Sequence, residues 1–480
     1  MIRLKGEITV FLSLVLVILV SVLFTVIDAA RSHAAAFQTE CVADMALQSA
    51  LAEYNRELLE QYDLLFTDIG YGTEEDGYIL LEQHLLDYME ENFHAEGTFF
   101  SGEIRDLLRL SAVSAVIVEA AGAADGGGMV LERAAVDYMK DRYGMDPSFT
   151  AETVAMAETV REENFLGTAM EEKRLENERK IDSVDTTVED EDGKKHKIPV
   201  NNPADNVNSK RGSSGILKMV TEKNGISERE IDLTDYPSYR TCRERDGFLF
   251  GEAEISAAED LLFQKYLMEK CGSYTHEKGG GGLTYETEYI LAGKNTDREN
   301  LRTVVNRLLV IREAANFVYL LSDAGKMAEA EGLAAALSVV TLFPELKDLV
   351  KLSILIGWAY AESVNDVKIL LSGGKVPLLK SSASWRMDLK NAMKLKPDEV
   401  PEDGGEGFPY EGYLYALLAV TDRQERNRRF MDIVEMNVRE TEGNRGFRID
   451  NCIRAFTAEL YTCGVGGQEY MLTRRTGYLK

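Results

Sequence analysis

Residues 8–27 read ITVFLSLVLVILVSVLFTVI, an uninterrupted apolar run that decides where the rest of the chain is expected to lie. A helix of this length, rising about 1.5 Å per residue, measures roughly 30 Å, the thickness of a bilayer's hydrocarbon core. Arg3 and Lys5 precede the run, and no comparable basic cluster follows it closely. Because basic flanks stay in the cytoplasm, we predict a single-pass cell-membrane protein with a cytoplasmic N-terminus and an extracytoplasmic remainder.

A cleaved signal peptide is the alternative interpretation of the same run. Ala34, Ala35 and Ala36 offer a cleavage site of small residues. The run is longer than the roughly 7 to 15 apolar residues usual in such signals, and Ala36 lies well beyond its end. A retained anchor is therefore favoured, and the sequence leaves cleavage after Ala36 open.

The segment that follows, residues 28–66, is predicted to be one continuous amphipathic helix. Its apolar residues step by three or four along a single face: Leu47, Leu51, Tyr54, Leu58, Tyr62 and Leu65. Neither Gly nor Pro separates it from the apolar run, so a single rod of about 55 residues and about 80 Å is expected, suited to a stalk or filament subunit. An anchor followed by an ordinary core helix fits the pattern equally well.

The fold class predicted for the whole chain is predominantly α, with α+β possible. A strand is expected at residues 110–118, a turn at 125–128, and helices at 78–93, 300–321, 328–342, 346–371 and 422–439. The tail from 464 to 480 fits either strand or coil. The predicted divisions are a cytoplasmic N-terminus (1–7), a transmembrane helix (8–27), a mixed membrane-proximal domain (28–160), a charged linker or solvated helix (161–200) and a mostly helical domain (201–480).

Composition limits the possible partners. The formal net charge of −27 would repel polyanions, so nucleic acid is not an expected partner. The five cysteines lack metal-binding or redox spacing, and an odd number leaves at least one unpaired within a single chain. Cys452 and Cys463 are close enough in sequence to pair in an oxidising compartment, or they are small buried core residues.

No catalytic, cofactor-binding or metal site is predicted. Gly293 to Thr296 and Gly373 to Lys375 depart from the phosphate-loop pattern, which leaves loops or helix caps as their interpretation. His84 and His94, near Glu82, Asp87 and Glu91, favour a solvated helical face over a metal site. The acidic residues 189–192 lack the alternating ligands of a calcium-binding EF-hand.

The N-terminal sixty residues resemble the N-termini of Tad and Flp pilus-assembly proteins of the TadE and TadG type. The resemblance rests on Gly6, Asp28, Ala29, Ala30, Gln38, Asp44 and an alanine-rich helical face. Phe11 stands where true prepilins carry glutamate, and Glu7 directly follows Gly6, which argues against processing after Gly6. The resemblance implies a membrane-held helix that projects a domain outward.

Most of the chain also resembles a bacterial family catalogued as domain of unknown function 5702. The matching segments are 137–140 (DYMK), 202–203 (NP), 285–293 (YETEYILAG), 311–316 (IREAAN), 358–366 (WAYAESVND) and 376–378 (VPL). This resemblance implies a membrane-anchored, surface-side protein associated with Tad-like systems, and it supplies no mechanism.

These observations favour a non-enzymatic structural or assembly component of a Tad/Flp-like pilus or secretion apparatus. Its expected partners are the membrane, other apparatus proteins and a second copy of the chain through the N-terminal helix. A surface receptor or adhesin using Tyr410, Tyr413 and Tyr415 is the alternative, although tyrosines at this spacing more often pack than bind. An extracytoplasmic hydrolase is the third hypothesis, and it requires a pocket with convergent polar groups.

Overall fold

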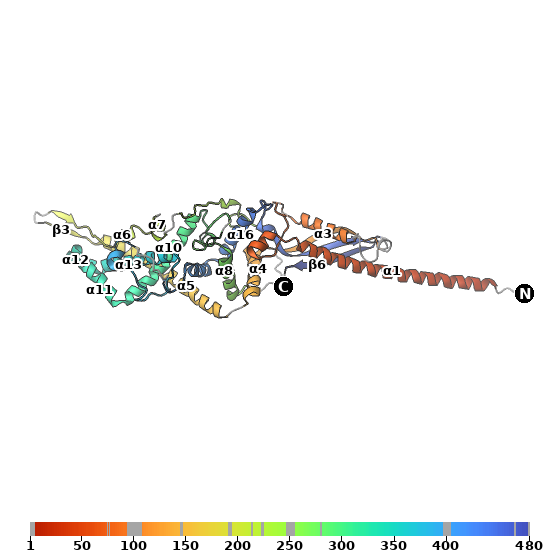
Figure 1. Ribbon diagram of the computed structural model, residues 1–480, viewed down its shortest axis with the longest axis horizontal. Helices are drawn as coiled ribbons and strands as arrows, with labels where there is room; N and C mark the ends of the chain where they lie inside the picture. The colour runs from red at the N-terminus through yellow and green to blue at the C-terminus, as the bar shows by residue number, and fades with distance from the viewer. Residues whose placement is uncertain are drawn as a thin grey trace. The chain divides into compact units, whose positions relative to one another are not determined.

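The computed structural model describes residues 5–73, 75, 77–93, 108–144, 147–190, 194–212, 215–221, 225–245, 255–278, 281–396, 405–464 and 467–478 (Figure 1). The chain divides into two compact units. Unit 1 comprises Met1–Ala134, Thr241–Ala253 and Thr441–Lys480, and unit 2 comprises Ala135–Arg240 and Glu254–Glu440. Both units are assembled from separated segments, whereas the predicted divisions were consecutive along the chain.

Unit 1 combines helices with an antiparallel sheet. Its helices are α1 (Lys5–Leu51), α2 (Arg56–Tyr62), α3 (Ile79–Phe93), the start of α4 (Asp125–Tyr143) and the 3₁₀ turn η3 (Ile449–Asn451). Its strands are β1 (Thr67–Asp68), β2 (Ser111–Gly122), β5 (Cys452–Cys463) and β6 (Glu469–Gly477). Strand β5 pairs with β2 along one edge and with β1 and β6 along the other, so it is the central strand.

The core of unit 1 lies between this sheet and the pair of helices α1 and α3. Strand β5 contributes Phe456, Ala458 and Leu460, which alternate along the strand and therefore point to the same face. Helix α1 contributes mostly small residues, including Ala43 and Ala46, which allow its backbone to approach closely. The second half of α1 is therefore a core element of unit 1.

The predicted continuous helix over 28–66 is wrong beyond Leu51, where α1 ends. Asn55 begins the separate helix α2, because its side-chain oxygen accepts a hydrogen bond from Leu58 N at 3.1 Å. Asp63 ends α2 in the left-handed conformation, with φ of 54°. Leu58 and Tyr62 remain buried, so the apolar spacing persists while the chain changes direction.

The strand predicted at 110–118 is confirmed and extends from Ser111 to Gly122. The predicted turn at 125–128 is also confirmed, since Gly126, Gly127 and Gly128 have φ values of 62°, 71° and 91°. Residues other than glycine rarely adopt such values. In the tail, residues 469–477 form strand β6.

The suggested pairing of Cys452 with Cys463 is wrong. These residues occupy the two ends of β5, and a strand rises about 3.3 Å per residue, which places them far beyond disulfide reach. All five cysteines are free thiols, and Cys271 and Cys452 are buried.

Unit 2 is almost entirely helical, and its elements have the following bounds. They are α5 (Pro147–Ser183), α6 (Asp205–Asn208), α7 (Ile216–Val220), η2 (Leu233–Asp235), α8 (Ala257–Lys270), α9 (Glu286–Ala292), α10 (Asp297–Ser322), α11 (Ala324–Ala335), α12 (Ser338–Leu342), α13 (Leu346–Leu371), α14 (Leu389–Ala392), α15 (Tyr410–Val420), α16 (Arg423–Arg439) and a hairpin of β3 (Thr187–Glu189) and β4 (Lys195–Lys197). The predicted helix at 328–342 is divided between α11 and α12.

Helix α13 is the centre of unit 2 and packs against α5, α10 and α11. Helix α5 includes residues 161–183, which the sequence suggested to be a linker or solvated helix. Most side chains of residues 161–183 are exposed, as expected of a solvated helix, but one face packs within unit 2, where Ile181 is buried and Asn177 Nδ2 donates to Leu349 O and Ser353 Oγ, each at 2.9 Å. Few hydrophobic residues suffice here because polar side chains supply part of the contact.

The Leu460→Ala substitution is expected to destabilise unit 1 by about 2–5 kcal/mol, because it leaves a cavity in the buried face of β5. Amide hydrogen exchange across β2 and β5 in the detergent-solubilised chain measures the change in opening free energy. Met471→Ala, on the neighbouring strand and 61% exposed, is the control and should change it by less than about 0.5 kcal/mol. Equal effects of the two substitutions would contradict the assigned core.

Candidate functional site

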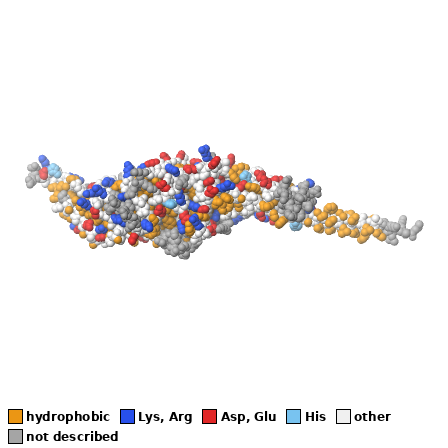
Figure 2. Space-filling model, in the orientation of Figure 1, with side chains coloured by type: hydrophobic (Ala, Val, Ile, Leu, Met, Phe, Trp, Pro, Cys, Tyr) orange, Lys and Arg blue, Asp and Glu red, His pale blue; other side chains and the backbone are white. Residues whose placement is uncertain are grey.

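Helix α1 consists of two halves that differ in burial. In the half from Ile8 to Ile27 the large apolar side chains lie uncovered, with Phe11 and Phe24 each 66% exposed. Figure 2 shows this half as a continuous hydrophobic surface. Among the described residues, α1 is the one helix long and apolar enough to cross a membrane. A bilayer would remove this surface from water, which the protein itself does not do.

Polar contacts attach the second half of α1 to strand β6 and the turn before it. Ser32 Oγ donates to Gln468 Oε1 at 2.9 Å. Further along, the Arg474 guanidinium lies 3.6 Å from a carboxylate oxygen of Glu40 and 3.7 Å from one of Asp44. These pairs are partly exposed, so their main effect is to orient α1 rather than to stabilise unit 1 strongly.

The two halves of α1 are joined without a helical break. Residues 34–36, the small-residue segment considered for cleavage, lie within the helix, and Ala35 is 5% exposed. From Ala35 onward, buried residues recur at helical spacing and include Val42 and Leu47. A single rigid element therefore leads from the uncovered apolar half into the core of unit 1.

Of the histidines considered as metal ligands, His84 instead contacts Glu53 in unit 1, together with two tyrosines. His84 Nδ1 lies 3.0 Å from Glu53 Oε2, and the hydroxyls of Tyr71 and Tyr88 each donate to the Glu53 carboxylate at 2.6 Å. Burial disfavours the carboxylate, but these hydrogen bonds outweigh it and lower the pKa of Glu53. His94 lies outside the described residues.

The acidic residues near His84 have separate roles. Glu82 Oε1 accepts from Ile117 N of strand β2 at 2.8 Å, and Asp87 accepts from Gln83 at 2.9 Å. Across the described parts of the chain, histidine, cysteine and acidic side chains form no group of three or more that could hold a metal ion. Glu82 satisfies a backbone donor of strand β2 and is not part of a metal-binding group among the described residues.

The glycine-containing motifs act as helix caps, as expected from their departures from the phosphate-loop pattern. Gly293 ends α9 in the left-handed conformation, with φ of 64°. Thr296 begins α10, because its side chain accepts from Glu299 N. Gly373 follows α13 with φ of 85°.

In the acidic stretch 189–192, Asp190 accepts from Lys194 N at 2.9 Å, and residues 191–193 lie outside the described residues.

Of the tyrosines considered for adhesion, two lie in the interior of unit 2 and Tyr415 is half-buried. Tyr410 and Tyr413 are buried, and Tyr410 OH donates to Glu288 Oε1 at 2.9 Å. Tyr415 OH donates to Leu261 O at 2.8 Å. The hydroxyls satisfy internal acceptors, so these residues do not form a binding surface in this conformation.

Sequence reasoning missed a buried charge network in unit 2. Arg312 of α10 donates through Nε to Asp366 Oδ2 of α13 at 3.2 Å. Lys380 Nζ bridges Asp366 Oδ1 and Glu362 Oε1, each at 2.6 Å. The side chains of all four residues are at most 1% exposed. The network is closed to solvent and fixes α10 and the segment around Lys380 against α13.

The two carboxyl groups of this network are shifted in opposite directions. Burial disfavours a charged Asp366, but Lys380 and Arg312 outweigh it and hold the pKa of Asp366 below its usual range. Burial and the charge of Asp366 raise the pKa of Glu362. Three of the four residues lie in the segments 311–316 and 358–366 that carry the family resemblance, which is the one sequence signal for this network.

Glu163 of α5 is the unsatisfied member of this interior. It is 6% exposed, and neither carboxylate oxygen has a hydrogen-bond partner among the described residues. Burial raises its pKa to about 7, although the charge of Arg312 opposes the shift. The Glu163 carboxyl group therefore titrates near pH 7 and interacts electrostatically with the permanently charged Arg312 guanidinium.

These observations define a two-unit protein with an uncovered apolar helix and a closed, charge-containing helical core. Residues 193–464 match the model of a family of unknown function, DUF5702. The match covers more than half of the chain, and the chain belongs to this family. It includes Arg312, Glu362, Asp366 and Lys380 and excludes helix α1. No curated protein and no solved structure matches the chain.

Glu163→Gln is expected to stabilise unit 2 at pH 8 by about 1–3 kcal/mol and to have a smaller effect at pH 5. The folded pKa of about 7 lies above the ordinary 4.5, so the native state retains a proton that the unfolded chain releases. Stability therefore falls as pH rises between these values, and glutamine removes that loss.

The change in unfolding free energy is measured by urea unfolding of the detergent-solubilised chain, with hydrogen exchange in α5 and α10 as the readout. Glu162→Gln is the matched control, since the neighbouring Glu162 is exposed, and it should change stability little at either pH. An effect of Glu163→Gln that does not depend on pH would contradict the raised pKa.

Proposed function

We propose that this chain is a single-pass membrane protein with a cytoplasmic N-terminus and extracytoplasmic units. The observation that carries the proposal is the continuity of α1, whose uncovered apolar half leads directly into a half buried in unit 1. Arg3 and Lys5 before the apolar run, with acidic Asp28 directly after it, support this orientation. The burial of Ala35 supports a retained anchor over cleavage after Ala36.

The proposed role is that of a non-enzymatic structural or assembly component of a Tad/Flp-like pilus or secretion apparatus. A helix that enters a folded core without a hinge passes any tilt or rotation of the membrane segment to unit 1. Such rigidity suits an assembly component. The network around Asp366 supports the non-enzymatic role, because Asp366 is ion-paired with Arg312 and Lys380 and these side chains are covered by protein. The Tad-like resemblance of the N-terminal residues supports the choice of apparatus.

The uncovered half of α1 also suits contact with other membrane helices. Its apolar side chains point outward all around the axis, so partner helices and lipid can both cover them. We therefore include a second copy of the chain, joined through this helix, among the proposed partners.

The topology is tested with fusions to the C-terminus. An alkaline phosphatase fusion is expected to be active and a green fluorescent protein fusion dark, because the C-terminal region lies outside the cytoplasm. N-terminal sequencing from membranes is expected to show residues 1–27 retained. A mature chain that begins at Phe37, or a fluorescent fusion protein, would refute the proposed topology.

Replacing both Leu16 and Leu19 by arginine is expected to shift the protein out of the membrane fraction. Each arginine near the centre of the apolar run costs about 2.5–3.5 kcal/mol of insertion free energy. Phe37→Arg is the control, because Phe37 is 70% exposed and lies beyond the run, and it should leave the protein in the membrane. Loss of membrane attachment in both variants would point to misfolding instead.

The assembly role is tested by photo-crosslinking in cells. A crosslinking residue at Leu16 is expected to capture a second copy or another membrane protein, whereas one at the buried Ala46 should capture neither. Deletion of the protein should alter surface appendages or secretion. The assembly role would be eliminated if appendages and secretion were unchanged and the crosslinker at Leu16 captured no other protein. The proposed topology would be unaffected by that result.

A further inference from the structure

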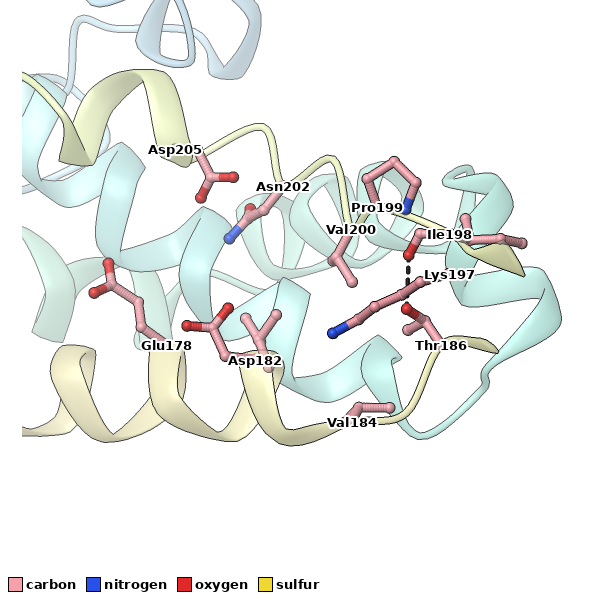
Figure 3. A pocket seen from close by; sticks show the side chains of 11 residues that line it. Glu178, Asp182, Val184, Thr186, Lys197, Ile198, Pro199, Val200, Asn202 and Asp205 are labelled. Carbon is pink, nitrogen blue, oxygen red and sulfur yellow. Dashed lines mark hydrogen bonds between the residues drawn. The ribbon is translucent and has the colours of Figure 1, made fainter. Parts of the chain in front are cut away.

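Unit 2 contains a cavity of about 520 Å³ where α5 ends (Figure 3). Glu178 and Asp182 line it from the last turns of α5, and Asp205 lines it from the first turn of α6. The chain that enters and leaves the β3–β4 hairpin forms the opposite wall. Thr186 and Ile198 hold this wall together, since Ile198 N donates to Thr186 O at 3.0 Å and Thr186 Oγ1 donates to Ile198 O at 2.6 Å.

Asn202 presents a donor to this cavity. Asn202 is 7% exposed, and its Oδ1 accepts a hydrogen bond from Ala204 N at 3.1 Å, which fixes the orientation of the amide. With the oxygen held in this way, Nδ2 is directed toward the cavity, and Figure 3 shows it on the side of Asp205 and the α5 carboxylates. Nδ2 has no hydrogen-bond partner in the part of the chain that the structure describes. This amide N–H is therefore available to an acceptor that enters the cavity, although Asn202 as a whole is only 7% exposed.

The cavity contains three carboxylates, and Lys197 lines it together with them. Glu178 is paired, since Oε1 accepts from Arg174 Nη1 at 2.6 Å and from Asn208 Nδ2 at 3.0 Å. Asp182 and Asp205 form no ion pair with any described residue. Burial and the negative charges of Glu178 and Asp182 raise the pKa of Asp205. A cation placed between these carboxylates would relieve their mutual repulsion.

The cavity suits an organic cation better than a metal ion. Its carboxylates do not form a group that could hold a metal. Ile181, Val184 and Val200 provide an apolar lining suited to an aliphatic stem. Lys197 also lines the cavity, so its ammonium and Asn202 Nδ2 offer donors to carbonyl oxygens. Carboxylates, an apolar wall and two donors together match a basic side chain and its own peptide backbone.

We propose that this cavity binds an extended peptide segment through one lysine or arginine side chain. The basic group lies between Asp182 and Asp205, the aliphatic stem contacts the apolar wall, and a backbone carbonyl accepts from Asn202 Nδ2. The segment belongs to a partner protein, which gives unit 2 a recognition role that is independent of the membrane anchor.

The test uses the full chain in detergent and labelled pentapeptides Gly-Val-X-Val-Gly, with fluorescence anisotropy as the readout. With X as lysine or arginine, binding is expected to be at least about tenfold tighter than with norleucine, as for a charge-assisted hydrogen bond. The double variant Asp182→Asn with Asp205→Asn should remove this preference. Glu172→Gln, an exposed acid on the same helix, should retain it.

Several results would overturn the proposal. Equal binding of the norleucine peptide, retention of the preference in the double variant, or absence of binding at millimolar peptide would each do so. If 1,5-diaminopentane binds as tightly as the lysine peptide, the ligand is a small amine and the peptide assignment is wrong. Displacement of the peptide by micromolar Ca²⁺ would assign a metal site instead. Circular dichroism checks that the isosteric variants remain folded.

Discussion

The uncovered apolar half of α1 is the constraint on which the arrangement of unit 1 depends. Apolar surface costs about 25 cal/mol per Å² in water, so this half requires a bilayer or other apolar partners. The apolar half can orient unit 1 in a membrane only if the second half of α1 is held firmly within unit 1. Unit 1 achieves this by placing small residues such as Ala43 and Ala46 against its core and by joining α1 to strands from the opposite end of the chain.

Local patterns predicted the elements whose stability is largely local in origin. Helix α13 has the predicted bounds, 346–371, and strand β2 lies where small and β-branched residues predicted it. The central strand β5 was missed because its partner β2 lies more than 300 residues earlier and nearly every residue of β5 is buried, which removes the alternation expected of a half-exposed strand. The break after Leu51 was missed because Asn55 competes for the backbone without disturbing the apolar spacing.

The charge network shows why site prediction fails even where the elements are predicted correctly. Glu362 and Asp366 lie one helical turn apart, a spacing that usually marks a solvated face. The apolar residues around them give the contrary signal, since most of α13 from Ser353 onward is buried on all sides. A carboxylate on such a helix requires a cation from another element. Neither Arg312 nor Lys380 could be assigned to that task before the helices were placed together.

Such buried ions are weak evidence for added stability, because desolvation offsets much of their attraction. They are strong constraints on geometry, since displacement of α10 from α13 would leave Arg312 and Asp366 uncompensated in the interior. The network therefore favours one arrangement of these helices.

This constraint has a functional consequence for the cavity at the end of α5. Asn177, five residues before Asp182 on α5, is bound to α13 through Ser353, so the acidic wall is held by the same helix that carries the network. A recognition site held in this way loses little conformational entropy when a ligand binds.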